Sequence, residues 1–299
     1  MKHDRPPRIP SLFIGVDGGG SGCRARIEDA DGRVLGTGTA GPAAVRLGIE
    51  TAMTALTNAC LAAVADAGLP PEALIRMNAG IGLAGVGRQG ALERIKAWPH
   101  PFHSVTYVND ANIACLGAHG GREGGIVIVG TGSVGFAIVG GREIRLGGYG
   151  FPISDEGSGA DLGLQAIRMA LRAQDGRISA TTFTLEVMER FQDDPFEAVT
   201  WMDRATATDY ARFAPMVMQH AEAGDGVARE IVSKAAEQID DLIRQLQGSG
   251  AQRVALLGGL AAPMQPWLAP DIQRSLSAVE GDALDGALYL ARRAALETA

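Results

Sequence analysis

A carboxylate followed by three glycines and a hydroxyl residue is the feature of this sequence most suited to chemistry. Asp17 ends an apolar segment that begins at Phe13, and residues 18–21 (Gly-Gly-Gly-Ser) follow it. Glycines let a ligand approach the backbone without a Cβ in the way, and successive N–H groups in such a turn suit phosphate oxygens. A nearby carboxylate can hold a hydrated Mg²⁺. The segment is therefore a candidate phosphate turn, with a tight acidic β-hairpin as the alternative.

A second turn of the same kind occurs later in the chain. Residues 130–133 (Gly-Thr-Gly-Ser) lie between the apolar segments 126–129 and 136–139. This plan of strand, turn and strand repeats that of residues 13–26 and predicts an internal duplication. The simplest use of two such turns is a cleft that both of them line.

Further carboxylates follow strand-like or loop segments. Asp110 comes directly after the strand-like residues 104–109 and before a helical pattern. Ligands bind at the carboxyl ends of strands in open α/β sheets, which favours a functional role for Asp110 over an N-cap worth about 1 kcal/mol. Asp155 and Glu156 lie in a Gly/Ser-rich loop, a common place for function. In the same loop, Ser158 and Asp161 are interpreted as a capping box.

Length and composition set the fold class. A chain of 299 residues with 46% hydrophobic residues and 41 glycines is typical of a globular α/β protein with two domains. Strands alternate with helices over the first part, residues 159–248 are mostly helical, and residues 282–298 form a closing helix. A net charge of −7 argues against nucleic-acid binding. The N-terminal residues lack the apolar core of a signal peptide, and no apolar segment reaches about 18 residues, so no membrane attachment is expected.

Other glycine patterns match nucleotide-binding motifs in part. Residues 130–135 match G-x-G-x-x-G, but strand-like sequence follows them where a dinucleotide site needs a helix. Residues 80–85 match it too, with a strand before and a helix after, and remain a weaker alternative. A P-loop needs a lysine after its glycines, and the lysines, Lys2, Lys96 and Lys234, do not follow a glycine-rich turn. Phosphate handling must therefore rely on backbone N–H groups, hydroxyls and a metal ion.

The cysteines show no sign of a metal site. Cys23, Cys60 and Cys115 form no CxxC pair, which fits a reducing cytoplasm. Cys115 and His119 are one helical turn apart, but two ligands do not make a zinc site.

Four short segments, taken in order, carry a family resemblance. They are residues 17–21, 130–133, 155–158 and 258–259. This combination resembles the actin-like ATPase superfamily of sugar kinases and Hsp70. Within it the sequence is similar to the BadF/BadG-type ATPase family, most closely to its glucosamine and N-acetylglucosamine kinases. The segments VNDA, CLGAHGGREG and FPISDEGSGA strengthen the resemblance, which covers essentially the whole chain.

The resemblance implies a fold and an activity. It implies α/β architecture with duplicated ribonuclease-H-like (actin-like ATPase) domains and an interdomain cleft. The first domain would span residues 1–118, completed by the helix 283–299, and the second residues 119–282 with a helical insertion. The activity implied is phosphorylation of an amino-sugar 6-hydroxyl by ATP with Mg²⁺, in a cytoplasmic homodimer.

The resemblance also assigns roles to residues of this sequence. Asp110 falls at the general base, and the residues implied in sugar binding are Asp110, Gly148, Tyr149, Gly150 and Asp155. The implied ATP-binding residues are Asp17, Gly18, Gly19, Gly20, Ser21, Gly130, Thr131, Gly132, Ser133, Gly258 and Gly259. Mg²⁺ would be held near Asp17 through water.

Two departures and two alternatives accompany the resemblance. Ser21 stands where many relatives have threonine, and Ala43 and Ala44 stand where relatives commonly carry a sugar-binding asparagine. The first alternative is an ATPase that activates a partner enzyme through a bridging iron–sulfur cluster, which needs four thiolates, two from each subunit. The second is a non-catalytic sugar sensor, which should lack the base or a phosphate turn.

Overall fold

The chain forms two compact units in the computed structural model, which describes residues 12–87 and 90–297. The first unit takes Met1–Glu123 and Val279–Ala299, and the second takes Gly124–Ala278. The boundaries therefore differ slightly from the expected 118/119 and 282/283. The reason is that residues 119–123 stay with the first unit: Arg122 forms an ion pair with Glu280, and the Glu280 N–H donates to the Ala118 carbonyl at 3.0 Å. The N-terminal segment and the last two residues of the expected closing helix lie outside the described residues.

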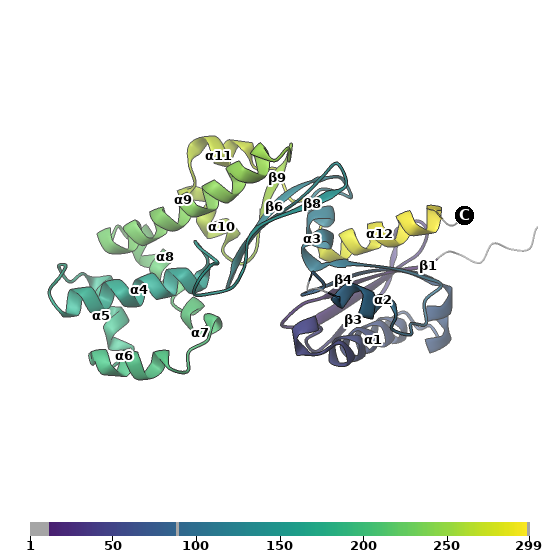
Figure 1. Ribbon diagram of the computed structural model, residues 1–299, viewed down its shortest axis with the longest axis horizontal. Coiled ribbons are helices and arrows are strands. Elements are labelled where there is room, and N and C mark those ends of the chain that lie inside the picture. The colour runs from purple at the N-terminus through teal and green to yellow at the C-terminus, as the bar shows by residue number, and fades with distance from the viewer. Residues whose placement is uncertain (1–11, 88–89, 298–299) are drawn as a thin grey trace, which may run out of the picture. The chain divides into compact units, whose positions relative to one another are not determined.

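A mixed five-stranded sheet forms the centre of the first unit (Figure 1). Its strands are β1 (Leu12–Gly18), β2 (Cys23–Glu28), β3 (Val34–Ala40), β4 (Met77–Leu83) and β5 (Ser104–Asn109), in the order β3-β2-β1-β4-β5. The first three strands are antiparallel, while β4 and β5 run parallel to β1. The carboxyl ends of β1, β4 and β5 therefore lie at one edge of the sheet.

Helices cover both faces of this sheet, which explains why β1 is apolar along almost its whole length. Helix α1 (Ile49–Asp66) lies against β3, where a Cβ at Gly38 would be 2.2 Å from the Ala59 carbonyl oxygen. Helices α3 (Asp110–Ala118) and α12 (Ala283–Glu297) cover the other face. The first unit is completed by η1 (Val45–Leu47), η2 (Pro71–Arg76) and α2 (Ala91–Lys96).

The glycines of β4 serve this packing and not a dinucleotide. A Cβ at Gly80 would lie 1.9 Å from the Ala287 carbonyl oxygen of α12, and one at Gly82 would lie 2.3 Å from the Ile113 side chain of α3. Both glycines are buried inside the strand. The dinucleotide interpretation of residues 80–85 is therefore wrong.

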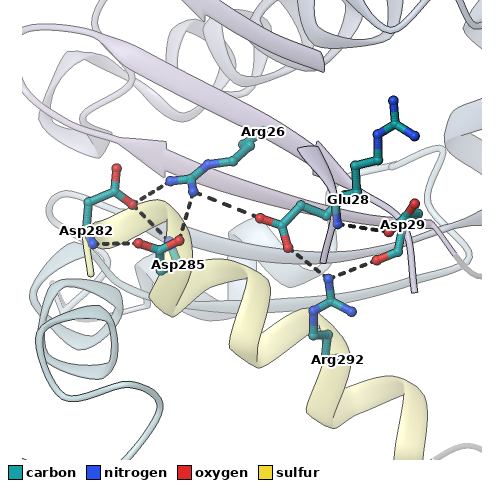
Figure 2. Close-up of polar contacts among 7 residues, drawn as sticks. Arg26, Glu28, Asp29, Asp282, Asp285 and Arg292 are labelled. Carbon is teal, nitrogen blue, oxygen red and sulfur yellow. Dashed lines mark hydrogen bonds and ion pairs between the residues drawn. The ribbon is translucent and has the colours of Figure 1, made fainter. Parts of the chain in front are cut away.

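Charged side chains fix α12 to β2 although the two elements lie far apart in sequence (Figure 2). The Arg26 guanidinium bonds the Asp282 and Asp285 carboxylates at 2.6 and 2.8 Å, and Arg292 bonds Glu28 at 2.8 Å. Asp282 and Asp285 also accept each other's backbone N–H groups, at 3.0 and 2.7 Å, which satisfies donors at the start of α12. The closing helix is thereby held on the first unit.

A four-stranded sheet forms the centre of the second unit. Its strands are β6 (Gly124–Val129), β7 (Ser133–Val139), β8 (Arg142–Gly147) and β9 (Val254–Leu257), in the order β8-β7-β6-β9. The antiparallel and parallel pairings match those of β3-β2-β1-β4 in the first unit. Beside β9, Val254 makes an isolated parallel bridge with Leu276.

Six helices lie between β8 and β9 in the second unit (Figure 1). They are α4 (Gly159–Gln174), α5 (Thr182–Glu189), α6 (Pro195–Met202), α7 (Ala207–Ala211), α8 (Ala214–Glu222) and α9 (Gly226–Gly248). One face of α9 is apolar, and its residues Ile231, Ala235, Ile239 and Leu246 are buried. After β9 come α10 (Ala261–Met264), η3 (Gln265–Trp267) and α11 (Pro270–Ser275). Within residues 12–87 and 90–297, no helix is long and apolar enough to cross a bilayer.

Candidate functional site

Two carboxylates lie at the carboxyl edge of the parallel strands in the first unit. The register aligns Gly18 of β1 with Leu83 of β4, and Leu83 with Asn109 of β5. These three residues form a row across the sheet. Asp17 therefore comes one residue before this row on β1, and Asp110 comes one residue after it, directly beyond β5. Because one strand separates β1 from β5, their backbones lie about 10 Å apart across the sheet. This is the edge where open α/β sheets bind ligands.

Asp110 begins helix α3, and the N-cap is its neighbour. The Asn109 side chain accepts the Ala111 N–H at 2.9 Å, so the alternative that Asp110 is the cap is wrong. Asp110 is the first helical residue, and its Oδ1 lies 3.0 Å from the same N–H.

The Asp17 carboxylate is held by a cation from the neighbouring strand. Arg24, directly opposite on β2, donates to Asp17 Oδ2 at 2.6 Å. This hydrogen bond raises the pKa of Arg24 above its ordinary value. The β-hairpin turns at residues 20–21, and Asp17 and Arg24 are equally far from that turn. This equal spacing is the sequence signal that could have predicted the pair.

The first glycine turn is shaped by packing more than by unusual backbone angles. None of Gly18, Gly19 and Gly20 has a positive φ. Gly18 is required by space, since a Cβ there would lie 2.4 Å from the Leu83 side chain. The Gly19 N–H donates to the Gly22 carbonyl at 2.9 Å, and Gly20 and Ser21 are exposed at the tip. The exposed tip leaves room for a phosphate to approach the backbone.

Ala43 and Ala44 lie behind this turn. The Ala43 N–H donates to the Gly19 carbonyl at 3.0 Å, and both methyl groups are buried. Neither side chain can hydrogen-bond a sugar. These positions therefore support the first turn without replacing the asparagine side chain expected from the resemblance.

In the second unit, the turn at residues 130–133 meets two other predicted segments. The Gly159 and Ala160 N–H groups at the start of α4 donate to the Gly130 and Thr131 carbonyls at 2.8 and 3.1 Å. The Leu260 N–H donates to the Val129 carbonyl at 3.0 Å. The turn, the start of α4 and residues 258–260 are thereby joined at one edge of the sheet.

Three of the residues predicted to bind ATP differ in exposure or backbone conformation. The Ser133 side chain is buried, and its hydroxyl donates to the Glu156 carbonyl at 2.6 Å, so its proton is directed inward. Thr131 is exposed. Gly258 has a φ of 100°, and a Cβ there would lie 2.3 Å from the Val129 carbonyl oxygen. Only glycine fits this position without strain.

The predicted sugar loop lies against the same turn. Asp155 has a φ of 68°, and its Oδ1 accepts the Gly150 N–H at 3.2 Å. Its Oδ2 would be 2.6 Å from a Cβ at Gly132. Burial, opposed by the Gly150 N–H, raises the pKa of Asp155. The carboxylate of the predicted sugar loop and the second glycine turn thus share one small region.

The remaining loop residues are open to solvent or serve as caps. Tyr149 is exposed with the Arg145 guanidinium 5.4 Å from its ring centre, and Gly148 has a φ of 67°. The expected capping box forms only in part. Ser158 Oγ accepts the Asp161 N–H at 3.2 Å, but Asp161 accepts the N–H of Gly157 at 3.0 Å in place of that of Ser158.

The donor groups suit a hydrated divalent cation better than a thiolate-bound metal. Asp17 offers one carboxylate, and Ser21 at the tip of the turn offers an exposed hydroxyl, which matches Mg²⁺ that takes its other ligands from phosphates and water. Cys23, Cys60 and Cys115 are at most 1% exposed. Burial raises the pKa of Cys23 to about 12. Among residues 12–87 and 90–297, no three His, Cys, Asp or Glu side chains group as metal ligands.

Comparisons with known proteins show which proteins this chain is similar to. Glucosamine kinase GspK of Vibrio cholerae is 40% identical over 281 residues, covering 94% of this chain and 96% of that protein. An N-acetylmuramic acid/N-acetylglucosamine kinase of Clostridium acetobutylicum is 31% identical and covers 76% of each chain. A crystal structure from Chromobacterium violaceum, provisionally named N-acetylglucosamine kinase, is 35% identical with a TM-score of 0.84 and covers 94% of this chain and 99% of that one.

A family model gives the same result. It is described as the BadF/BadG/BcrA/BcrD ATPase family and matches residues 14–282, nearly the whole of the described chain. The match spans both glycine turns, Asp110, the loop that holds Asp155, and residues 258–259. The chain belongs to the BadF/BadG/BcrA/BcrD ATPase family.

Proposed function

We propose that this chain is an ATP-dependent kinase that phosphorylates the 6-hydroxyl of an amino sugar, with glucosamine as the first substrate to test and N-acetylglucosamine as the second. The observation that carries the proposal is the placement of Asp17 and Asp110 at one ligand-binding sheet edge, beside an exposed glycine turn. The 40% identity to a glucosamine kinase over 94% of the chain supports the choice of substrate.

In this proposal Asp110 is the general base. Its carboxylate takes the proton of the 6-hydroxyl as the hydroxyl oxygen forms a bond to the γ-phosphorus and the bond to the ADP oxygen breaks. Phosphoryl transfer depends mainly on positioning and charge stabilisation. The turns at residues 18–21 and 130–133 supply backbone N–H groups to the phosphates. Asp17 would hold Mg²⁺ through water, and Mg²⁺ bound there neutralises phosphate charge.

The proposal includes closure of the two units over one ATP. The turns at residues 18–21 and 130–133 belong to different units, and they have corresponding places in two sheets with matching strand order. A shared triphosphate would require both turns to line one cleft. Closure would also exclude water that could otherwise accept the phosphate. X-ray scattering should show a smaller radius of gyration with glucosamine and a non-hydrolysable ATP analogue than with either ligand alone.

The sugar itself is proposed to lie beside residues 148–150 and Asp155, within reach of Asp110. Asp155 is oriented by the Gly150 N–H, which fits a carboxylate that receives sugar hydroxyls. An ADP-release screen over glucose, glucosamine and N-acetylglucosamine tests the proposal. Turnover with an amino sugar at least about tenfold above that with glucose is expected. ADP release that no sugar stimulates would reject the kinase proposal and favour a sugar sensor.

The iron–sulfur activator is the less favoured alternative. A bridging cluster needs thiolates at a subunit surface. Cys23, Cys60 and Cys115 lie on β2, α1 and α3, and all three are buried. This burial disfavours a bridging cluster. We also propose, as the family resemblance implies, that the kinase is a cytoplasmic homodimer, and sedimentation of the purified chain tests the dimer.

A further inference from the structure

The helical part of the second unit contains a cavity that the proposed reaction does not use. Its volume is about 370 Å³, within the range of small-molecule sites. Side chains of α5, α7 and α8 line it together with Trp201 of α6. Helices α5 and α6 lie at the end of the second unit away from its sheet (Figure 1), whereas Ala211 of α7 lies close to Gly159 at the start of α4.

Three aromatic rings form one wall of this cavity. Ring centres lie 5.6 Å apart for Phe191 and Trp201, and 5.9 Å apart for Trp201 and Phe213. Phe191 is buried, whereas Trp201 and Phe213 remain partly exposed and border the cavity. Partly exposed aromatic rings favour a planar apolar group, which can stack on them or meet their edges.

The rim of the cavity carries two carboxylates and two arginines. Two carboxylates there are already engaged: Glu186 bonds His220 at 2.7 Å, and Asp209 bonds the Thr206 hydroxyl at 2.7 Å and Arg212 at 3.0 Å. Arg190 is exposed and forms no ion pair with any carboxylate in the described part of the chain. An arginine at the mouth of an aromatic cavity can bind a carboxylate, sulfonate or phosphate through two parallel N–H groups.

Tyr210 connects this wall to the predicted sugar loop. Its ring lies 4.8 Å from that of Trp201 and 4.9 Å from that of Phe151, which stands in the loop between Tyr149 and Asp155. The Tyr210 carbonyl oxygen would be 2.0 Å from a Cβ at Gly163, so α7 and α4 are in close contact. The first residues of α4 in turn bond the second phosphate turn.

We propose that this cavity is a second ligand site, which takes a small aromatic anion, and that Tyr210 transmits its occupation to residues 148–157. The ring system of the ligand packs on Trp201 and Phe213, and its anionic group bonds Arg190. Binding at this site does not depend on kinase activity, so its test is independent of the proposed function.

Two matched probes test the site on the full chain. The anion 8-anilinonaphthalene-1-sulfonate has an uncharged counterpart, N-phenyl-1-naphthylamine, with the same rings and no sulfonate. The sulfonate probe should bind one site per chain more tightly than the uncharged probe. Arg190→Gln should weaken the sulfonate probe about twofold to fivefold, the usual range for an exposed charge pair, and leave the uncharged probe unchanged. Arg274→Gln, an exposed arginine elsewhere in the second unit, is the control and should change neither.

Tryptophan fluorescence locates the bound probe. The chain has three tryptophans, so energy transfer to the probe can be assigned by substitution. Trp201→Phe keeps an aromatic ring in the wall and should remove most of the transfer, whereas Trp267→Phe should not. Equal affinity for the two probes, equal effects of the two arginine substitutions, or unchanged transfer in Trp201→Phe would overturn the site.

Hydrogen exchange tests the connection to the loop. The sulfonate probe should slow backbone exchange in residues 148–157 of the wild-type chain and of Arg274→Gln. The effect should be smaller in Arg190→Gln at the same sub-saturating probe concentration. Exchange in these residues that bound probe leaves unchanged would refute transmission through Tyr210.

Discussion

Arg24 donates a 2.6 Å hydrogen bond to the Asp17 carboxylate across the β1–β2 pair. The two residues are direct cross-strand neighbours, and the Arg24 side chain is half exposed while that of Asp17 is mostly covered. The Arg24 guanidinium therefore competes with Mg²⁺ for the Asp17 carboxylate that is proposed to hold the ion. Because the pair is partly solvated, we expect a modest energy, about 0.2–1 kcal/mol.

Substitution of this pair should change the requirement for Mg²⁺ in opposite directions. Arg24→Gln removes the competing cation and should lower the half-saturating Mg²⁺ concentration about twofold to fivefold. Asp17→Asn removes the charge that attracts the ion and should raise it. Mg²⁺ titrations of ADP release and of fluorescent ATP-analogue binding measure both effects. The exposed Arg33 provides the control, Arg33→Gln, and a higher requirement in Arg24→Gln than in this control would contradict the assignment.

Two adjacent glycines should respond differently to alanine. Gly258 has a φ of 100° and no space for a side chain, so Gly258→Ala should lower the free energy of unfolding by about 1–3 kcal/mol. A Cβ at Gly259 meets nothing within 4 Å, so Gly259→Ala should leave stability near that of the wild type. Urea unfolding measures both.

Gly259→Ala also tests the nucleotide site, because its stability is expected to be unchanged. If ATP approaches the backbone at residue 259, the added methyl group should raise KM for ATP several-fold with little effect on KM for the sugar. Wild-type KM values in a variant of wild-type stability would place the nucleotide elsewhere.

The individual strands and the glycine turns could be predicted because their signals are local. Residues 126–129 and 136–139 are apolar segments joined by a short turn, and they form β6 and β7 as expected. The strand expected before Asp110 and the helix expected after that strand form β5 and α3. What sequence could not supply was the packing role of Gly80, which depends on α12 about 200 residues further along the chain, and that of Gly82, which depends on the Ile113 side chain of α3.

Side-chain partners were also hard to predict. The Asn109 cap was missed because Asn109 and Asp110 both favour that position, and the choice depends on where the helix begins. The direction of the Ser133 hydroxyl depends on the Glu156 carbonyl in a distant loop. The cavity beside Trp201 is formed by four separate helices, whose packing no local pattern reveals.

Asp240 of α9 should make stability depend on pH. It is 5% exposed, its Oδ2 accepts the Ala269 N–H at 3.0 Å, and its Oδ1 has no partner in the described chain. Burial, opposed by the Ala269 N–H and Arg244 and reinforced by Asp271 and Asp241, raises the pKa of Asp240. A raised carboxyl pKa means that folding favours the protonated form. The stabilisation is thus present at acid pH and is lost as pH rises through the folded pKa.

Asp240→Asn removes this dependence. The unfolding free energy of the variant relative to the wild type should increase between about pH 4 and pH 7. Asp209 provides a control of opposite sign, because hydrogen bonds from Thr206 lower the pKa of Asp209. Asp209→Asn should be less stable than the wild type above about pH 4, and this difference should shrink as pH falls below the ordinary aspartate pKa. Urea unfolding at several pH values measures both, and parallel curves for wild type and Asp240→Asn would show that Asp240 titrates normally.

The role of Asp110 is the central claim, and sugar-dependent ADP release by Asp110→Asn tests it most directly. Removal of a general base should lower kcat about 10²- to 10⁴-fold. Asn109 retains the cap of α3, so the fold and the affinity for ATP should stay close to those of the wild type. A well-folded Asp110→Asn protein that releases ADP with glucosamine at the wild-type rate would contradict the account.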